Sequence, residues 1–176
     1  MEGQPPPTPA RSLESYLGAI EVLVKQLART GGFELGVTMR KAATPGEEIE
    51  TPEFVVDFSG PDADLLLEKN ASLLNALEYV VLKAVRLEED LFGKITFDCN
   101  DWRCLRAEEL KLMAQVAAER VVETGDPFTL NPMSPRERRI IHLALRDQAG
   151  VRTVSEGAGS ERKVVIHPAS PPARKR

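Results

Sequence analysis

The spacing of hydrophobic residues predicts a first block of helices and strands. Apolar residues recur at helical spacing over 13–31, alternate over 33–39 and form a short continuous run over 54–58. These patterns predict a helix, a strand with one buried side and a second strand. The same patterns predict three further features, a short helical segment over 62–67, a polar junction over 68–71 and a third strand around 95–97. Between the junction and that strand, a long helix is predicted to turn inward Leu73, Leu74, Leu77, Val80, Val81, Ala84 and Val85.

A second block follows from about residue 105. A helix is predicted over 105–123, a short strand over 128–130, and a closing hairpin from the β-rich stretches 151–154 and 164–166. Ser134-Pro135-Arg136-Glu137 combines a capping box with proline at the first helical position, which predicts a helix from there to about residue 148. The buried stripe of the 105–123 helix is predicted to be Leu110, Met113, Ala114, Ala117 and Val121.

These blocks indicate an α+β fold of two small domains, in which helices cover one face of a small sheet. The first domain has the order α-β-β-α-α-β and is expected over 12–99, and the second is expected over 100–168. Residues 1–11 are rich in proline and lack large apolar side chains, so they are predicted to be disordered. Residues 169–176 are predicted to form a flexible basic tail.

Composition narrows the functional classes. Of 176 residues, 28% are charged, the apolar runs are short and no charged-then-apolar leader opens the chain, so we expect a cytoplasmic protein without membrane insertion. Cys99 and Cys104 are too few for a disulfide framework and have no nearby histidine, which favours reduced thiols. Asp57, Asp62 and Asp64 are interpreted as solvated surface. Because the common catalytic and phosphate-loop motifs are missing, we expect a non-enzyme with no cofactor and no metal.

The charge is split along the chain and points to one end of it. Residues 1–135 hold 13 Lys+Arg against 23 Asp+Glu, whereas residues 136–176 hold 10 against 4, so a nucleic-acid surface is expected mainly in the last quarter. Arg138, His142 and Arg146 are spaced by four and are predicted to form one strip of a helix, with guanidinium and imidazole donors suited to phosphate oxygens. The alternative is a solvated helix face that pairs with Glu137 and Asp147.

One stretch of sequence resembles a known family. Residues 131–142 read Asn-Pro-Met-Ser-Pro-Arg-Glu-Arg-Arg-Ile-Ile-His, and together with the Ser-Glu-Gly turn at 155–157 and the basic strand 162–166 they closely resemble the Arg-xxx-His (R-3-H) domain of the bacterial Jag, or SpoIIIJ-associated, RNA-binding proteins. Upstream, the element order and residues 73–79 resemble the KH domain of that family, and the resemblance covers roughly 13–168. The family's separate N-terminal domain is expected to be missing.

The resemblance implies a non-catalytic binder of single-stranded RNA, with single-stranded DNA left open as a competitor. It places Arg138, His142 and Arg162 on the polynucleotide-binding surface. Further phosphate contacts are expected from Arg139, Arg146, Arg152 and Lys163, with a steep dependence on salt. Kinship also implies a small partner protein made of one KH domain and a role in cell-envelope growth or cell division.

One departure from the family changes the expectation for the first domain. KH domains hold nucleotides with a Gly-x-x-Gly loop, whose bare backbone lets phosphates approach closely. Here that place reads Glu68-Lys69-Asn70-Ala71, so both glycines are missing and Lys69 is the one cation left. We therefore expect the first domain to have a structural or partner-docking role. The alternative function is a protein-interaction adaptor whose KH domain has lost RNA binding and docks a partner protein.

Overall fold

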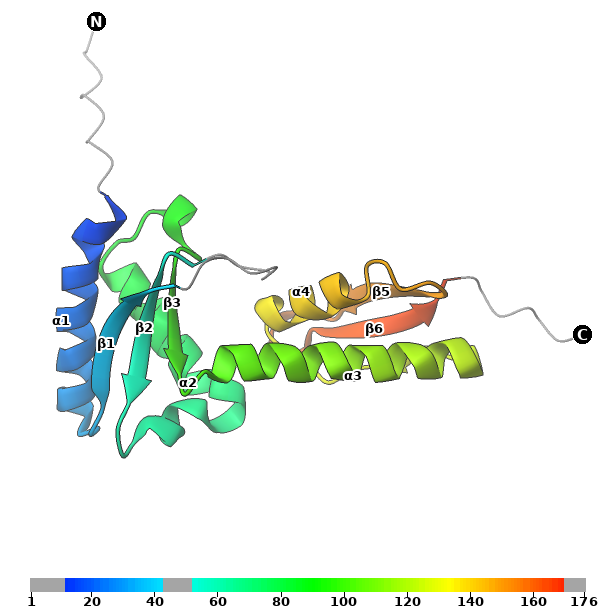
Figure 1. The fold of residues 1–176 in the computed structure, drawn as a ribbon, viewed down its shortest axis with the longest axis horizontal. Coiled ribbons are helices and arrows are strands. Elements are labelled where there is room, and N and C mark those ends of the chain that lie inside the picture. Colours follow the sequence, from blue (N-terminus) through cyan, green and yellow to red (C-terminus); the bar gives the residue numbers. More distant parts are fainter. Residues whose placement is uncertain (1–11, 43–51, 170–176) are drawn as a thin grey trace, which may run out of the picture. The chain divides into compact units, whose positions relative to one another are not determined.

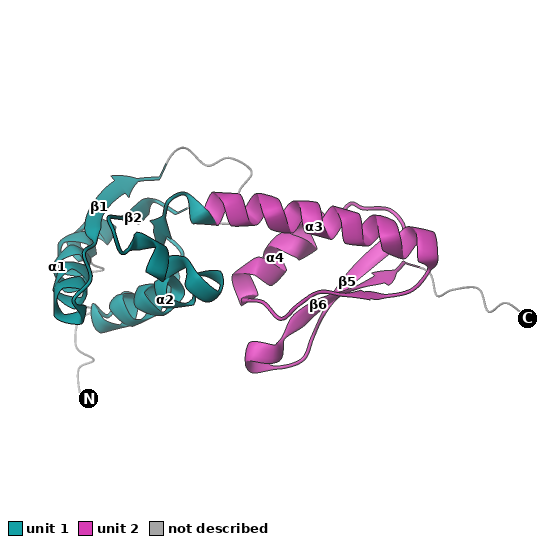
Figure 2. Ribbon diagram, turned by 90° about the horizontal axis from the view of Figure 1, so that it is seen from below, with its two compact units in different colours: residues 1–102 teal, residues 103–176 magenta. Residues whose placement is uncertain are grey.

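The computed structural model describes residues 12–42 and 52–169. The expectations for residues 1–11 and for the tail from 170 to 176 lie outside the described residues. The chain divides into two compact units, residues 1–102 and 103–176 (Figures 1 and 2). Each unit has its own three-stranded sheet and its own helices, which confirms the predicted α+β fold class. In the described part of the chain, no helix is long and apolar enough to cross a bilayer.

The first unit has the predicted order of elements. Helix α1 (Leu13–Gly31) is followed by β1 (Gly36–Lys41), β2 (Phe54–Ser59), α2 (Ala63–Ala84), a short 3-10 turn (Glu89–Leu91) and β3 (Ile95–Cys99). The sheet order is β1-β2-β3, with β1 antiparallel and β3 parallel to β2. Gly32 ends α1 because it adopts a left-handed φ of 75°, and the N–H of Phe33 then reaches back to the carbonyl of Ala28 at 2.9 Å.

The core of this unit lies between the sheet and the two helices. Alternate residues of β2 point to the same face, and α1 and α2 contribute to one buried cluster with that face (Figure 1). The predicted inward set of α2 is partly wrong, because Leu73 is 40% and Val80 53% exposed, and Ala84 is exposed too. The apolar positions of α2 form two adjacent stripes, and only one of them can meet the sheet. The fully buried members of the cluster include Ile20, Val56, Phe58, Leu74, Val81, Ile95 and Phe97.

The predicted polar junction is a left-handed turn that interrupts α2. Glu68 has an extended ψ of 149°, and Lys69, Asn70 and Ala71 have φ values of 49°, 58° and 54°. Lys69 and Asn70 are exposed, whereas the side chain of Ala71 is fully buried in the core. Left-handed backbone costs an ordinary L-residue about 1–2 kcal/mol. The turn therefore keeps a conformation that glycine adopts most easily, although it contains no glycine.

The second unit is built from two helices and a small antiparallel sheet. Its elements are α3 (Trp102–Thr124), which starts at the last residue of the first unit, β4 (Phe128–Thr129), α4 (Pro135–Ala144), β5 (Val151–Glu156), a 3-10 turn (Gly159–Glu161) and β6 (Lys163–Pro168). The sheet order is β4-β6-β5, with both neighbours of β6 antiparallel to it. The predicted closing hairpin is confirmed.

Two predictions for the helices of this unit are wrong. Helix α4 ends at Ala144 and not near residue 148, because the chain tightens into turns in which the N–H of Arg146 donates to the carbonyl of Leu143 at 3.3 Å. In α3, Met113 is 36% exposed rather than buried. Ala118 is buried in its place, since the small alanines allow close packing only along one narrow face of the helix. The buried stripe of α3 consists of Leu110, Ala114, Ala117, Ala118 and Val121.

Candidate nucleic-acid interface

The predicted capping box is present and stabilises the start of α4. The Ser134 hydroxyl accepts the N–H of Glu137 at 3.3 Å, and a carboxylate oxygen of Glu137 accepts the N–H of Ser134 at 2.9 Å. Pro135 follows Ser134 with its φ already suited to the helix. Because two otherwise unpaired backbone donors are satisfied, the first turn of α4 is held firmly. Arg138 and His142 are therefore presented from a rigid helix.

Glu137 also ties α4 to α3 through a half-buried ion pair. Its second carboxylate oxygen accepts Nε of Arg106 at 2.9 Å, and the side chains are 10% and 17% exposed. Arg106 donates a further hydrogen bond to Glu109 at 2.8 Å. Sequence alone placed Glu137 as a partner for the cationic strip of α4. The carboxylate is instead used by Arg106 and by the cap, so it does not neutralise Arg138.

Arg138 is a buried cation without a protein acceptor. Its side chain is only 9% exposed, and Nε is fully buried without a hydrogen-bond partner. Among the described residues, no carboxylate lies within ion-pair distance of it. Burying an unpaired charge is unfavourable, and native proteins normally avoid it. The other nitrogens of this guanidinium also have no hydrogen bond or ion pair with the described residues, so they are the donors that an anion from outside the chain could use.

His142 is bound on both ring nitrogens to hydroxyls of β5. Nδ1 lies 2.6 Å from Oγ1 of Thr153, and Nε2 lies 2.8 Å from Oγ of Ser155. The expectation of an imidazole donor free for phosphate is therefore not met in this structure. Burial lowers the pKa of His142 below its ordinary value, and the neighbouring charges of Arg138 and Arg162 lower it further. The ring is neutral at pH 7, with one nitrogen donating and the other accepting.

Arg162 joins this group from a distant part of the sequence. It lies between the 3-10 turn and β6, and its carbonyl accepts the N–H of Met133 at 3.2 Å, just before α4 begins. Its side chain is exposed and close enough to act electrostatically on His142. We call the group of Arg138, His142 and Arg162 the cationic cluster. It brings together two predicted helix residues and a third that follows 20 positions after the second.

The other predicted cations of the second unit do not belong to this cluster. Arg139 is exposed on α4, and Arg152 is exposed on the face of β5 opposite to Thr153 and Ser155, because neighbouring strand residues point to opposite sides. Lys163 is half-buried and pairs in register with Glu156.

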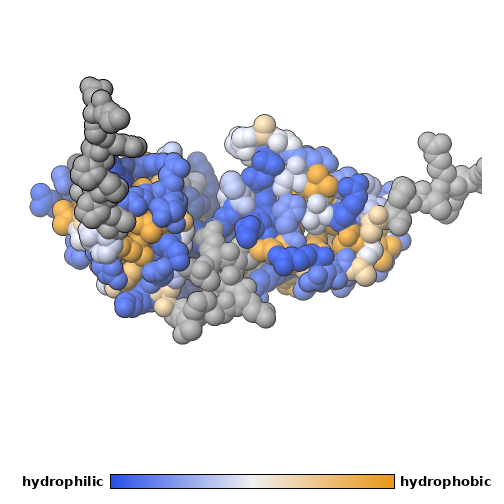
Figure 3. All heavy atoms as spheres, turned by 90° about the horizontal axis from the view of Figure 1, so that it is seen from above, coloured by the Kyte–Doolittle hydropathy of each residue, from blue (hydrophilic) through white to orange (hydrophobic). Residues whose placement is uncertain are grey.

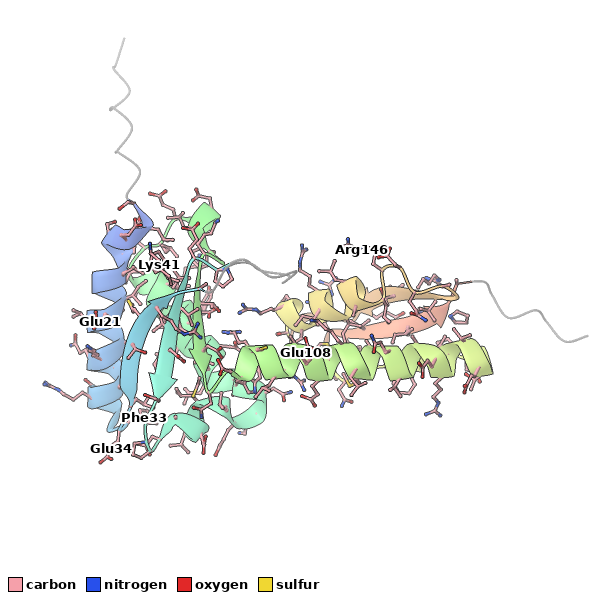
Figure 4. The ribbon with its side chains drawn as sticks, viewed as in Figure 1. Glu21, Phe33, Glu34, Lys41, Glu108 and Arg146 are labelled. Atoms are coloured by element: carbon pink, nitrogen blue, oxygen red, sulfur yellow. The ribbon has the colours of Figure 1, made fainter. Side chains whose placement is uncertain are left out.

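Two predicted binding residues stand apart from the cationic cluster. Arg146 is exposed beyond the end of α4, and Figure 4 shows it on the side of the unit away from α3. The predicted strip of three residues is therefore wrong for Arg146, since the helical spacing stops before it. Lys69 lies in the left-handed turn of the first unit, exposed to solvent.

Sequence reasoning missed the two hydroxyls and Arg106. Thr153 belonged to the predicted β-rich stretch 151–154, whereas Ser155 was assigned to the turn that follows it. Because β5 continues to Glu156, the two residues lie two apart on one strand and share a face of it. That spacing together with the histidine on the neighbouring helix was the available signal. Nothing in the sequence around Arg106 indicated its pairing with Glu137, because the two residues are 31 positions apart.

The acidic residues near one turn of the first unit have structural partners. Asp57 pairs with Arg40 at 3.3 Å, and Asp62 accepts the N–H of Glu34 at 2.7 Å. Burial, and then the charges of nearby aspartates, raise the pKa of the buried Cys99 thiol, while Cys104 is exposed. Within residues 12–42 and 52–169, no group of three or more His, Cys, Asp or Glu side chains has the arrangement of a metal site.

Comparison with known proteins places the cationic cluster in a recognised domain. Residues 108–168 match the family model of the R-3-H domain. The second unit contains an R-3-H domain. The match spans Arg138, His142 and Arg162, and it also includes Thr153 and Ser155 of β5. The paired hydroxyls therefore belong to the same domain as the arginines.

Several relatives share more than this domain. The chain is 34% identical over 114 residues to the RNA-binding protein KhpB of Clostridium symbiosum, covering 65% of this chain and 51% of that protein. It is 31% identical over 159 residues to KhpB of Lactiplantibacillus plantarum, covering 90% and 45%. For KhpB of Bacillus subtilis the identity is 34% over 111 residues, covering 62% and 53%. The predicted resemblance to the Jag family is confirmed, and the chain spans about half the length of these relatives.

Proposed function

We propose that this chain binds single-stranded RNA without catalysing a reaction, and that its R-3-H domain makes most of the contacts to phosphates. Support comes from the R-3-H match and from relatives that are named RNA-binding proteins. In this proposal the chain works in the cytoplasm, in a process connected with cell-envelope growth or cell division. Single-stranded DNA offers the same phosphates and is a competitor to be measured.

The observation that carries the proposal is the unpaired, buried guanidinium of Arg138. Arg162 adds a second guanidinium, and no carboxylate of the described residues pairs with either. A planar guanidinium matches the oxygens of a phosphate and binds them through paired hydrogen bonds. A phosphate of the RNA backbone would therefore supply the acceptor and the negative charge that the cationic cluster lacks.

The other predicted cations of the second unit are assigned a weaker role. In the proposal, Arg139, Arg146, Arg152 and Lys163 make looser contacts to neighbouring phosphates. Such contacts carry little sequence information and release counterions on binding. The affinity should therefore fall steeply as salt rises, with little preference among bases.

The first unit is assigned a lesser role in RNA binding. Its α-β-β-α-α-β order and the turn at 68–71 support a KH-like domain over 12–99, followed by the R-3-H domain over 100–168. Where a KH domain has a Gly-x-x-Gly loop, this turn carries Glu68, Lys69, Asn70 and the buried Ala71. The carboxylate of Glu68 repels phosphate, and only Lys69 attracts it.

Binding of a labelled single-stranded RNA by wild type and Arg138→Gln tests the proposal. Gln keeps much of the volume and removes the charge, so we expect affinity at least about tenfold lower, the size of one charge-assisted hydrogen bond. Arg29→Gln is the matched control, since Arg29 is an exposed cation of the first unit. Thermal unfolding of each variant separates lost binding from lost folding. Equal affinity of a folded Arg138→Gln protein would contradict the proposal.

A second candidate is a protein-interaction adaptor that docks a partner through the first unit. It is favoured by large apolar side chains exposed on α2, namely Leu73, Tyr79 and Val80. Figure 3 shows hydrophobic areas between hydrophilic residues on the face of the molecule that it presents. Here the partner would be a small single-KH protein. Restoring glycine with Glu68→Gly and Ala71→Gly separates the two functions, because a large gain in RNA affinity would show that the natural turn blocks binding.

A further inference from the structure

The hydrogen bonds of His142 to two hydroxyls restrict where the protons of these three side chains lie. A neutral imidazole has one N–H donor and one acceptor nitrogen. With a hydroxyl on each nitrogen, one hydroxyl must donate its proton to the ring and the other must accept from it. The hydroxyl that accepts keeps its own O–H proton free. Thr153, His142 and Ser155 thus form a chain of hydrogen bonds that ends in one free donor.

The geometry places Ser155 nearer to the two arginines than Thr153. Ser155 pairs in register with Val164, two positions after Arg162, whereas Thr153 pairs with Ile166, two residues further along β6. The carbonyl of Arg162 accepts the N–H of Met133, so the beginning of α4 lies at the same end of the sheet. Arg138 is one helical turn closer to that beginning than His142. Ser155 is therefore at the end of the hydrogen-bond chain that faces the arginines.

Burial and charge agree with a donor at this position. Ser155 and Thr153 are half-buried, and each is bound through its side chain to His142 alone among the described residues. Arg138 and Arg162 provide no acceptor for the O–H of Ser155, because guanidinium groups only donate. An anion between the arginines would accept that proton together with theirs.

We propose that the Ser155 hydroxyl is a third phosphate-binding group of this site, and that His142 is a positioning residue that directs it. Thr153 donates to Nδ1, which leaves the proton on Nε2; Nε2–H then donates to Ser155, whose own O–H points to the phosphate. This inference rests on the proposed function, since it needs a phosphate held by Arg138 and Arg162. Two kinds of phosphate have the required oxygens, the internal diester of a strand and a terminal monoester.

The test measures binding of a fluorescent single-stranded oligouridylate, made with either a 5′-hydroxyl or a 5′-phosphate. Ser155→Ala should bind about tenfold more weakly, as expected for a lost hydrogen bond to a charged group. Ser155→Thr keeps the hydroxyl in a residue that strands tolerate and should bind like wild type. Ser160→Ala is the matched control, because Ser160 is exposed and its hydroxyl contacts only Glu161. A loss confined to the 5′-phosphorylated probe identifies a terminal phosphate, and a loss with both probes identifies the internal diester.

The role of His142 has its own readout. Nitrogen-15 spectra of the imidazole distinguish the two neutral tautomers, and the wild type should carry its proton on Nε2. Thr153→Val removes the hydroxyl that fixes this tautomer and should shift the spectrum and weaken binding, whereas Thr153→Ser should preserve both. A proton found on Nδ1 in the wild type would overturn the assignment of Ser155 as the free donor.

The outcomes separate this inference from the proposed function. If Ser155→Ala binds like wild type while Arg138→Gln has lost affinity, the role of Ser155 is overturned and the RNA-binding proposal stands. Equal losses in Ser155→Ala and Ser155→Thr would indicate packing and would also overturn it. If Arg138→Gln itself binds like wild type, both the proposed function and this inference are contradicted.

Discussion

Two regions of this chain were predicted to meet phosphate, and the structure shows a different feature in each of them. The left-handed turn at 68–71 in the first unit keeps a glycine-like backbone, but its side chains include Glu68 and a buried Ala71. The cationic cluster of the second unit has two guanidinium groups near one imidazole, and Nε of Arg138 is buried without a hydrogen-bond partner. A turn persists when the core around it holds it in place. A binding site also needs donors that the protein itself does not use.

The largest effect should come from disconnecting α4 from α3. Glu137→Ala removes the acceptor of Arg106 and half of the capping box, so we expect the free energy of unfolding to fall by about 2–3 kcal/mol. Glu109→Ala is the control, because Glu109 is 65% exposed and should change stability by less than about 0.5 kcal/mol. Urea unfolding of both variants measures the difference. If Glu137→Ala and Glu109→Ala lower the free energy of unfolding by the same small amount, the ion pair between Glu137 and Arg106 does not stabilise the position of α4.

A pH titration should change the stability of the second unit through His142. The folded-state pKa of His142 is lowered, so the unfolded chain takes up its proton first as pH falls. Stability should therefore decrease as pH falls below the ordinary value near 6.5, and level off below the folded pKa. His142→Asn should remove this dependence, while His167→Gln should retain it. Thermal unfolding from pH 8 to pH 5 checks the sign.

RNA binding should shift the same titration in the opposite direction. A phosphate beside His142 favours the protonated ring and raises its pKa, so binding takes up a proton. The affinity should then rise as pH falls through that raised pKa. Calorimetry in two buffers of different ionisation enthalpy measures the proton uptake directly. No proton uptake near pH 6.5 would indicate that the phosphate lies away from His142.

The smallest effect is expected at the turn of the first unit. Lys69 has a φ of 49° and an exposed side chain, so Lys69→Gly should relieve backbone strain and stabilise the protein by about 0.5 kcal/mol, after the added entropy of the unfolded chain is subtracted. Lys41→Gly, at an exposed strand position, should destabilise by a similar amount. Chemical unfolding compares the two. A loss of stability in Lys69→Gly would mean that Lys69 makes interactions that outweigh the strain.

The sequence by itself determined the local features of this protein. The element order, the junction at 68–71, the capping box and the four-residue spacing of Arg138 and His142 all follow from residues within a few positions of one another. Helical and strand periodicity, turn chemistry and capping act over that range, which is why these predictions hold. The resemblance to the R-3-H domain rests on the same contiguous stretch.

Only the tertiary structure decided which of these groups meet. It brought Arg162 and the hydroxyls of Thr153 and Ser155 to His142, and it occupied both imidazole nitrogens that helical spacing had left free. Arg146 does not belong to the predicted strip because α4 ends at Ala144, and Glu137 forms an ion pair with Arg106. Each of these outcomes depends on how strands close onto a helix from distant parts of the chain. Periodicity has no information about that closure, because it describes one element at a time.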